Sequence, residues 1–205
     1  METIFIPAKR KLSVNKKKIE EISKKLPENI AIAYSIQYKN IAFEVKKILS
    51  KDHQITKLVQ VLGCSKLNFP KDTQAILLIS SGRFHAVSLA IETNLPIYIL
   101  ERNKLRKISK NETEDYRKKQ KASYLKFLNA DKIGILISTK PGQENLRKAL
   151  NFKNKLKDKK SYIFLADDIN INEFENFGLD CWVNTACPRL DMDSNFIINI
   201  DKIKS

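Results

Sequence analysis

Short apolar segments alternate with helix-like segments along this chain, and this alternation restricts the fold more than any other feature. Strands are expected where apolar residues form short runs, at 30–34, 55–62, 75–79, 96–100, 132–139, 161–166, 181–184 and 196–200. Helices are expected between them, at 14–26, 40–49, 84–93, 112–129, 144–156 and 172–177. A proline-interrupted strand is expected over 3–8, at a sheet edge. Such alternation with short connections predicts parallel sheets covered on both faces.

Residues 101–123 are nearly all polar, and the pattern restarts after them. The sequence therefore predicts an α/β fold of two small parallel-sheet domains, 1–108 carrying Cys64 and 109–205 carrying Cys187. The helix over 112–129 is expected to be long and exposed and to bridge the two. The halves share no sequence period, so the repeat is one of topology only.

The composition is that of a globular protein, with 42% hydrophobic and 30% charged residues among 205. No apolar run is long enough to span a membrane, and the first residues lack the apolar core of a signal peptide, so a cytoplasmic location is expected. The net charge of +15 would suit a nucleic-acid partner. Because the lysines are spread along the whole chain, a generally basic surface is favoured, and RNA binding stays open as an alternative.

Three cysteines, Cys64, Cys181 and Cys187, occur without an export signal, which favours reduced thiols. No C-x-x-C is present, so a self-contained zinc ribbon is excluded. Cys181 stands inside an apolar strand and is expected in the core. Cys187 precedes a proline and lies two residues before Arg189, and a thiolate near a positive charge can act as a metal ligand or nucleophile.

Unusual residues follow several of the predicted strands, where ligands bind in parallel sheets. Cys64 and Cys187 each stand at such a strand end, one per domain, so both thiols could reach one soft metal centre if the domains face each other. Taken singly, each is more often an inert buried residue. The turn at Gly82 offers free amides to an anion, although a plain strand-to-helix turn is the alternative.

Other polar clusters carry less information. The turn at 140–143 lacks the glycine-lysine-serine/threonine ending of a phosphate-binding loop, and no GxGxxG occurs. The carboxylates at 167–168 and at 191 and 193 are expected to be solvated loop charges.

Taken together, five stretches resemble the 2-(3-amino-3-carboxypropyl)histidine synthase family, which performs the first step of diphthamide biosynthesis. They occur in order over some 150 residues, at Gln37, Gln60–Cys64, Gly82–His85, Ser138–Gln143 and Asn184–Arg189. The resemblance implies a transferase in which three related α/β domains each give one cysteine to a 4Fe–4S cluster. The cluster cleaves S-adenosylmethionine, and the resulting 3-amino-3-carboxypropyl radical adds to a histidine of translation elongation factor 2.

The resemblance also implies roles for particular residues. It makes Cys64 and Cys187 the cluster ligands. It gives catalytic roles to His85, Gln143 and Arg189, and cofactor-binding roles to Gln37, Gly82, Arg83, Lys140, Gly142, Gln143 and Arg189. A carboxylate of S-adenosylmethionine would suit a guanidinium or a turn of free amides.

The sequence departs from the family pattern in ways that bear on activity. The part that matches begins with the family's second domain, so the first domain and its cysteine are expected to be missing. Ser81 replaces a usual acidic residue and Ala86 a usual proline, and Cys181 does not fall at a ligand position. Three accounts follow. A separate chain supplies the missing domain, the chain assembles with itself or a fuller paralogue, or it is a non-catalytic structural subunit or a basic RNA- or ribosome-binding module. The first is favoured, because both remaining ligand motifs are intact.

Overall fold

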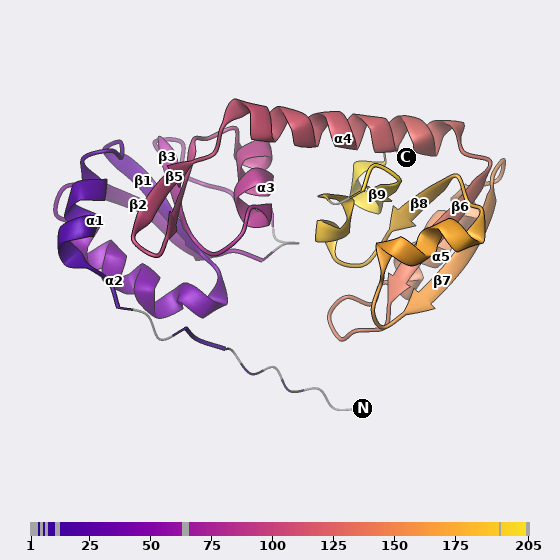
Figure 1. Ribbon diagram of the computed structural model, residues 1–205, viewed down its shortest axis with the longest axis horizontal. Coiled ribbons are helices and arrows are strands. Elements are labelled where there is room, and N and C mark those ends of the chain that lie inside the picture. The colour runs from indigo at the N-terminus through magenta and orange to yellow at the C-terminus, as the bar shows by residue number, and fades with distance from the viewer. Residues whose placement is uncertain are drawn as a thin grey trace. The chain divides into compact units, whose positions relative to one another are not determined.

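The structure is a computed structural model that describes residues 4, 6, 8–10, 13–62, 66–192 and 194–203. It divides into two compact units, Met1–Thr113 and Glu114–Ser205 (Figure 1). Of the strand expected over 3–8, residues 4, 6 and 8 are described and none is in a strand; the others lie outside the described residues. No helix in the described part of the chain is long and apolar enough to cross a membrane.

The first unit is built on a five-stranded sheet in the order β2-β1-β3-β4-β5. Its strands are β1 (Asn29–Tyr34), β2 (Gln54–Gln60), β3 (Ala75–Ile79), β4 (Ile97–Glu101) and β5 (Lys104–Lys107). Its helices are α1 (Lys16–Ser23), the 3-10 turn η1 (Ile36–Tyr38), α2 (Lys39–Leu49) and α3 (Phe84–Thr93). The first four strands of this order are parallel, and β5 pairs with β4 antiparallel.

Alternation along the central strand explains how helices cover both faces. Ile30 and Ile32 of β1 pack in one core cluster with residues of α1 and α2. Ala31 and Ala33 face the other way and pack with residues of α3. A strand buried on both faces reads as a continuous apolar run, which is why the sequence reveals it.

The sequence does not predict strand β5 (Lys104–Lys107), because its residues belong to the nearly all-polar stretch 101–123. It follows β4 through a tight turn in which Arg102 and Asn103 have φ of 47° and 61°. Two consecutive left-handed residues are typical of the two-residue hairpin turn that matches strand twist. Only Leu105 of this strand packs on the core, and the exposed lysines suit a sheet edge.

The second unit has a four-stranded, wholly parallel sheet in the order β7-β6-β8-β9. Its strands are β6 (Lys132–Ser138), β7 (Lys160–Ala166), β8 (Cys181–Asn184) and β9 (Ile197–Asn199). Its helices are α5 (Leu146–Lys155) and the 3-10 helices η2 (Ile171–Phe177), η3 (Pro188–Met192) and η4 (Ile200–Lys202). Helix α4 (Lys110–Asn129) begins in the first unit and continues into the second.

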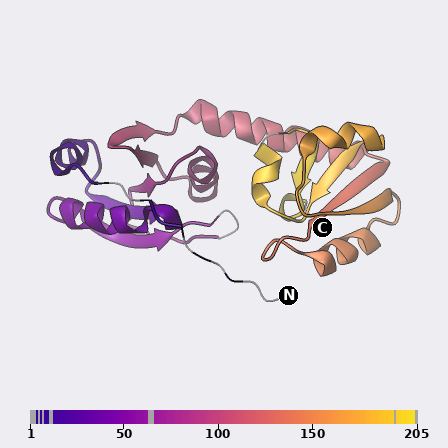
Figure 2. The same ribbon diagram turned by 60° about the horizontal axis from the view of Figure 1, so that its bottom comes forward.

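Both faces of the second sheet are covered (Figure 2). On one face, Phe127 of α4 and Ala149 of α5 pack with Ile133, Ile135 and Val183 of the sheet. On the other face, Trp182 packs with residues of η2, including Phe174, whose ring stacks on it at 4.3 Å. The helix expected over 172–177 is thus a 3-10 helix, and the α/β fold with parallel sheets is confirmed.

Candidate functional site

Each unit has one point where the strand order reverses. In the first unit β2 and β3 flank β1, and in the second β7 and β8 flank β6. Connections leave in opposite directions there, and ligands of open α/β sheets bind at such points, beyond the carboxyl ends of the strands, which here are β1 and β3 in the first unit and β6 and β8 in the second. The residues singled out from the sequence follow these four strands, with the exception of Cys64, which lies outside the described residues.

In the second unit, a buried asparagine holds the loop that carries Cys187. Asn184, the last residue of β8, is 2% exposed. Its Nδ2 donates to the carbonyl oxygen of Cys187 at 2.8 Å, and its Oδ1 accepts from the Ala186 N–H at 2.9 Å. Buried polar groups are costly unless hydrogen-bonded. The loop from β8 to Cys187 therefore has one favoured backbone path.

Two further asparagines form hydrogen bonds that hold the same loop. Asn199 of β9 accepts from Asn184 Nδ2 at 2.5 Å and donates from its own Nδ2 to the Pro188 carbonyl at 2.8 Å. Asn145, just before α5, donates to the Thr185 carbonyl at 2.7 Å and to the Gln143 carbonyl at 3.3 Å. The loop carrying Cys187 is thus tied to the neighbouring strand and to the turn that follows β6.

The Cys187 side chain itself is half-buried and forms no disulfide. Arg189 beside it is exposed and has no acidic partner within 4.0 Å among the residues that the structure describes. The arrangement fixes the backbone while leaving a thiol and a guanidinium reachable. Such a pair can offer a soft donor to a metal and a planar cation to a carboxylate.

Cys181, unlike the half-buried Cys187, is completely buried. It has no exposed surface and packs in the core under α4 and α5. Burial raises the pKa of its thiol to about 12. At neutral pH this group is a neutral, inaccessible thiol, so Cys181 is a core residue, as expected from its place in an apolar strand.

The turn after β6 gathers the other candidates of this unit. The Gln143 N–H donates to the Lys140 carbonyl at 3.0 Å, and Gly142 has a φ of 78° that L residues rarely adopt. The Lys140 ammonium pairs with Asp168, and the Thr139 hydroxyl donates to Asp167. These two carboxylates are exposed, but each is engaged by the neighbouring turn.

In the first unit, Gly82, Arg83 and His85 form the turn from β3 into α3. Gly82 has a φ of 92° and open space around an added Cβ, so its conformation, not crowding, requires glycine. His85 is half-buried, with its ring 5.2 Å from that of Phe84. Gln37, in the turn η1 that follows the adjacent β1, is exposed, and its backbone carbonyl oxygen accepts from the backbone N–H of Arg10 at 2.9 Å.

Arg83 is tied to a residue that the sequence analysis missed. Its Nε lies 3.2 Å from Glu112, which also receives a hydrogen bond from Arg106 at 2.9 Å. Ser109 and Glu112 exchange hydrogen bonds at 3.0 and 3.2 Å in a capping box at the start of α4. Burial would raise the pKa of Glu112, but hydrogen bonds from Ser109 and Arg106 and the charge of Arg106 together lower it. The Ser-x-x-Glu spacing in the sequence was the signal that could have indicated this capping box.

Two corrections concern polar residues. Asp191, expected to be a solvated loop charge, is 4% exposed and accepts a 2.6 Å hydrogen bond from the Tyr116 hydroxyl; Asp193 lies outside the described residues. The roles of Asn145, Asn184 and Asn199 were also missed. Within the described ranges, no group of three or more His, Cys, Asp or Glu side chains is placed to hold a metal ion.

The chain is similar in sequence to known proteins. A family model of diphthamide synthesis proteins matches residues 1–196. The 2-(3-amino-3-carboxypropyl)histidine synthase of Pyrococcus horikoshii is 30% identical, over 93% of this chain and 60% of that protein. The synthase of Methanocaldococcus jannaschii is 28% identical, over 94% of this chain and 57% of that protein.

Solved structures give the same result. A crystal structure of Dph2 from Pyrococcus horikoshii matches with a TM-score of 0.76 and 26% identity, over 91% of this chain and 59% of that one. A second structure of that protein, with a 4Fe-4S cluster, matches with a TM-score of 0.74 and 27% identity. The chain spans 60% and 57% of the length of the two archaeal synthases. It belongs to the diphthamide synthesis protein family.

Proposed function

We propose that this chain is part of the enzyme for the first step of diphthamide biosynthesis. The reaction would transfer a 3-amino-3-carboxypropyl group from S-adenosylmethionine to a histidine of translation elongation factor 2, in the cytoplasm. The observation that carries the proposal concerns Cys187. It is half-buried, its backbone is hydrogen-bonded to Asn184, and it follows β8 at the point where the strand order of the second sheet reverses. Family membership and the cluster-bound structure of a relative supply the chemical context.

A 4Fe–4S cluster fits the donors that the chain offers. Cluster iron prefers cysteine sulfur as its ligand, and Cys187 presents a thiol on a backbone held by Asn184. Cys181 is excluded as a ligand by its complete burial and its pKa of about 12. We assign Cys64 as a second ligand from its motif. A third thiolate must then come from outside these 205 residues, and we propose a separate chain that carries the portion of the relatives not matched here.

When bound, the cluster would supply the electron that cleaves S-adenosylmethionine. The chain's own residues would bind and orient the substrate. Arg189 is exposed beside Cys187 and suits the carboxylate of the aminocarboxypropyl group. Gln143 and Gly142 lie in the turn that Asn145 joins to the same loop, and they would support that end of the substrate.

The remaining assignments require changes in present contacts. Lys140 would have to leave Asp168, and Arg83 would have to leave Glu112, before either could bind an anion. The side chains of Lys140 and Arg83 are exposed to solvent. Exposed ion pairs contribute little stability, so both cations can leave their present partners and bind another anion. Gln37, Gly82 and His85 would contribute from the corresponding edge of the first sheet.

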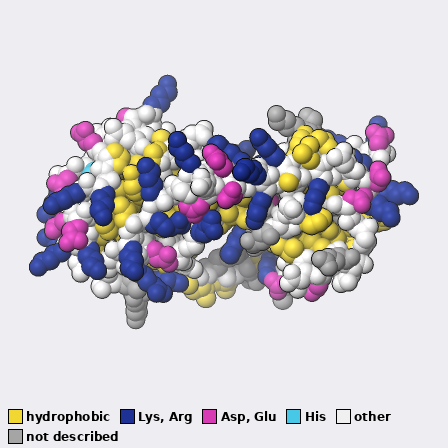
Figure 3. Space-filling view, turned by 45° about the horizontal axis from the view of Figure 1, so that its top comes forward, with side chains coloured by type: hydrophobic (Ala, Val, Ile, Leu, Met, Phe, Trp, Pro, Cys, Tyr) yellow, Lys and Arg dark blue, Asp and Glu magenta, His cyan; other side chains and the backbone are white. Residues whose placement is uncertain are grey.

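An alternative is a non-catalytic subunit, or a basic module that binds RNA or the ribosome. The net charge of +15 is the observation that favours it. Figure 3 shows lysine and arginine side chains scattered over the visible face, with acidic and apolar side chains between them. A scattered distribution suits a generally basic surface better than a dedicated nucleic-acid groove.

The test is transfer activity of the assembled enzyme. The chain is purified anaerobically with the partner that carries the remaining portion, and transfer of label from S-[carboxyl-14C]adenosylmethionine to elongation factor 2 is measured. Cys187→Ala should abolish transfer, while Cys181→Ala, a change of the same size in the same unit, should retain it. Full transfer with Cys187→Ala would instead identify a structural subunit, and the proposal would be wrong.

A further inference from the structure

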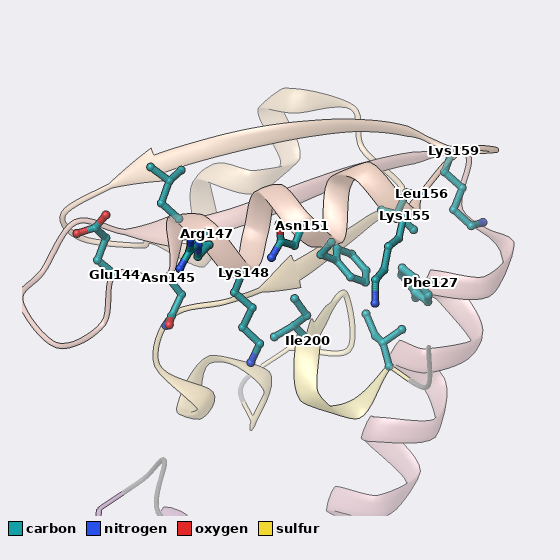
Figure 4. Close-up of a pocket in the computed structure, with 13 residues that line it drawn as sticks. Phe127, Glu144, Asn145, Arg147, Lys148, Asn151, Lys155, Leu156, Lys159 and Ile200 are labelled. Carbon is teal, nitrogen blue, oxygen red and sulfur yellow. The ribbon is translucent and has the colours of Figure 1, made fainter.

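The second unit contains a large groove in which the proposed function places no ligand. Its volume is about 1010 Å³, and its walls are α5, the end of α4 and the segment around η4 (Figure 4). The floor is formed by apolar side chains that are half-buried or nearly buried, namely Phe127, Phe152, Leu156, Ile200 and Ile203. Small-molecule pockets in proteins occupy roughly 300–1,000 Å³, so the volume of this groove lies at the upper end of that range.

The rim of the groove is basic. Arg147, Lys148, Lys155 and Lys159 line it, against one acidic lining residue, Glu144. Figure 4 shows Lys148 and Lys155 extending from α5 toward the segment that holds Ile200.

Two of these four cations already have partners. Lys148 pairs with Asp201 at 2.5 Å, and Lys159 donates to the carbonyls of Leu128 and Ala130 at 2.8 and 2.6 Å. Arg147 and Lys155 form no ion pair within 4.0 Å with any residue in the described ranges. The rim therefore presents two exposed positive charges above an apolar floor.

We propose that this groove binds an acidic amphipathic helix of a partner protein. Apolar side chains of the helix would cover the floor, and its carboxylates would meet Arg147 and Lys155. The ten residues of α5 make a wall about 15 Å long, the length of nearly three helical turns. This inference is independent of the chemistry proposed for Cys187.

The shape and charge of the groove disfavour other occupants. An extended strand would place unpaired backbone groups against apolar side chains, whereas a helix satisfies its own. A second copy of the chain carries the same net charge of +15 and would be repelled. Nucleic acid would leave the apolar floor without a partner, because its phosphates bind cationic and other polar groups.

The test uses three fluorescein-labelled peptides of equal length and the full chain. The first has leucines at helical spacing flanked by glutamates, the second replaces the glutamates with lysines, and the third scrambles the first. In fluorescence anisotropy, the first should bind at least about tenfold more tightly than the other two, which is a difference of 1.4 kcal/mol. Equal binding of the first and the scrambled peptide would overturn the proposal.

Variants of the chain locate the site. Arg147→Glu with Lys155→Glu should weaken the acidic peptide at least about tenfold, whereas Lys16→Glu with Lys17→Glu, the same change of charge on exposed residues of α1, should not. Leu146→Ala, which alters the lining, should weaken it more than Leu150→Ala, since both leucines are exposed on α5 but only Leu146 lines the groove. If poly(U) RNA or phosphatidylserine vesicles bind through Arg147 and Lys155 and the acidic peptide does not, the occupant is of another class and the proposal is wrong.

Discussion

The side-chain amide of Asn184 donates a 2.8 Å hydrogen bond to the carbonyl oxygen of Cys187, three residues further along the chain. The same amide group also donates to Asn199. One buried side chain thus joins the end of β8, the end of β9 and the loop that carries the proposed cluster ligand. The hydrogen bond from Asn184 therefore holds the backbone that carries the Cys187 thiol.

Replacing the Asn184 amide with a carboxylate should loosen this loop. In Asn184→Asp, an oxygen takes the place of the nitrogen that donates to Cys187 and Asn199. Buried groups left without their donors cost about 1–3 kcal/mol, so the free energy of unfolding should fall by that amount. The fluorescence of Trp182, the single tryptophan, reports urea unfolding of this unit. Asn195→Asp, at an exposed position, is the control and should change stability little.

The two cysteines of the second unit should differ sharply in reactivity. In a Cys64→Ser background at pH 8, iodoacetamide should modify Cys187 in the folded protein and leave Cys181 unmodified. Cys187 is half-buried, whereas Cys181 is fully buried with a pKa of about 12. Peptide mass mapping identifies the alkylated residue, and urea should expose both thiols. Alkylation of Cys181 at a rate similar to Cys187 in the native state would contradict the assignment of Cys181 to the core.

The Glu112 carboxylate should contribute to stability in a pH-dependent way. Because its pKa is lowered in the folded protein, its contribution is present above the ordinary value of 4.5 and is lost as the pH falls through the lowered value. Glu112→Gln should therefore reduce stability by about 1 kcal/mol at neutral pH, typical of a lost helix cap. The difference from the unsubstituted protein should shrink in acid. Unfolding followed by far-UV circular dichroism between pH 7 and 3 measures it, and Glu114→Gln, at an exposed position on α4, should show no such trend.

Gly134 should not tolerate even a methyl group. An added Cβ would overlap the Trp182 ring and lie 2.9 Å from Leu179 Cδ1. Trp182 has little freedom to move, because Phe164 and Phe174 pack against it at 4.7 and 4.3 Å. Overpacking of this kind costs about 1–3 kcal/mol, so Gly134→Ala should destabilise the unit and alter the near-UV circular dichroism of Trp182. An unchanged midpoint of urea unfolding would contradict this prediction, because it would mean that the Trp182 ring moves to make room for the added methyl group.

The sequence predicted the fold well wherever burial dominated. Strand β3 and helix α3 have the predicted bounds, since a fully apolar run and a glycine turn mark them without ambiguity. Strand β5 escaped prediction because it is an edge strand with a single residue on the core, so its pattern is almost entirely polar. Its signal was the Arg102–Asn103 turn, which is visible only once both residues are known to be left-handed.

The places of the motif residues in the fold could be predicted from the sequence, but the hydrogen bonds that hold their loops could not. Motif residues follow the expected strands, because the carboxyl ends of parallel strands share one edge. The contacts of Asn145, Asn184 and Asn199 depend on which strands become neighbours, and β9 lies beside β8 only through tertiary pairing. Asp191 was misjudged for the same reason, since its partner Tyr116 lies 75 positions away in the sequence.

The central claim is that Cys187 ligates an iron–sulfur cluster together with thiolates that include one from another chain. The most direct measurement is anaerobic reconstitution with iron and sulfide, read by visible absorbance and iron content, on this chain with its proposed partner. We predict a cluster in the complex that is retained in Cys181→Ala and lost in Cys187→Ala and Cys64→Ala. Full iron content in the complex with Cys187→Ala would contradict the claim.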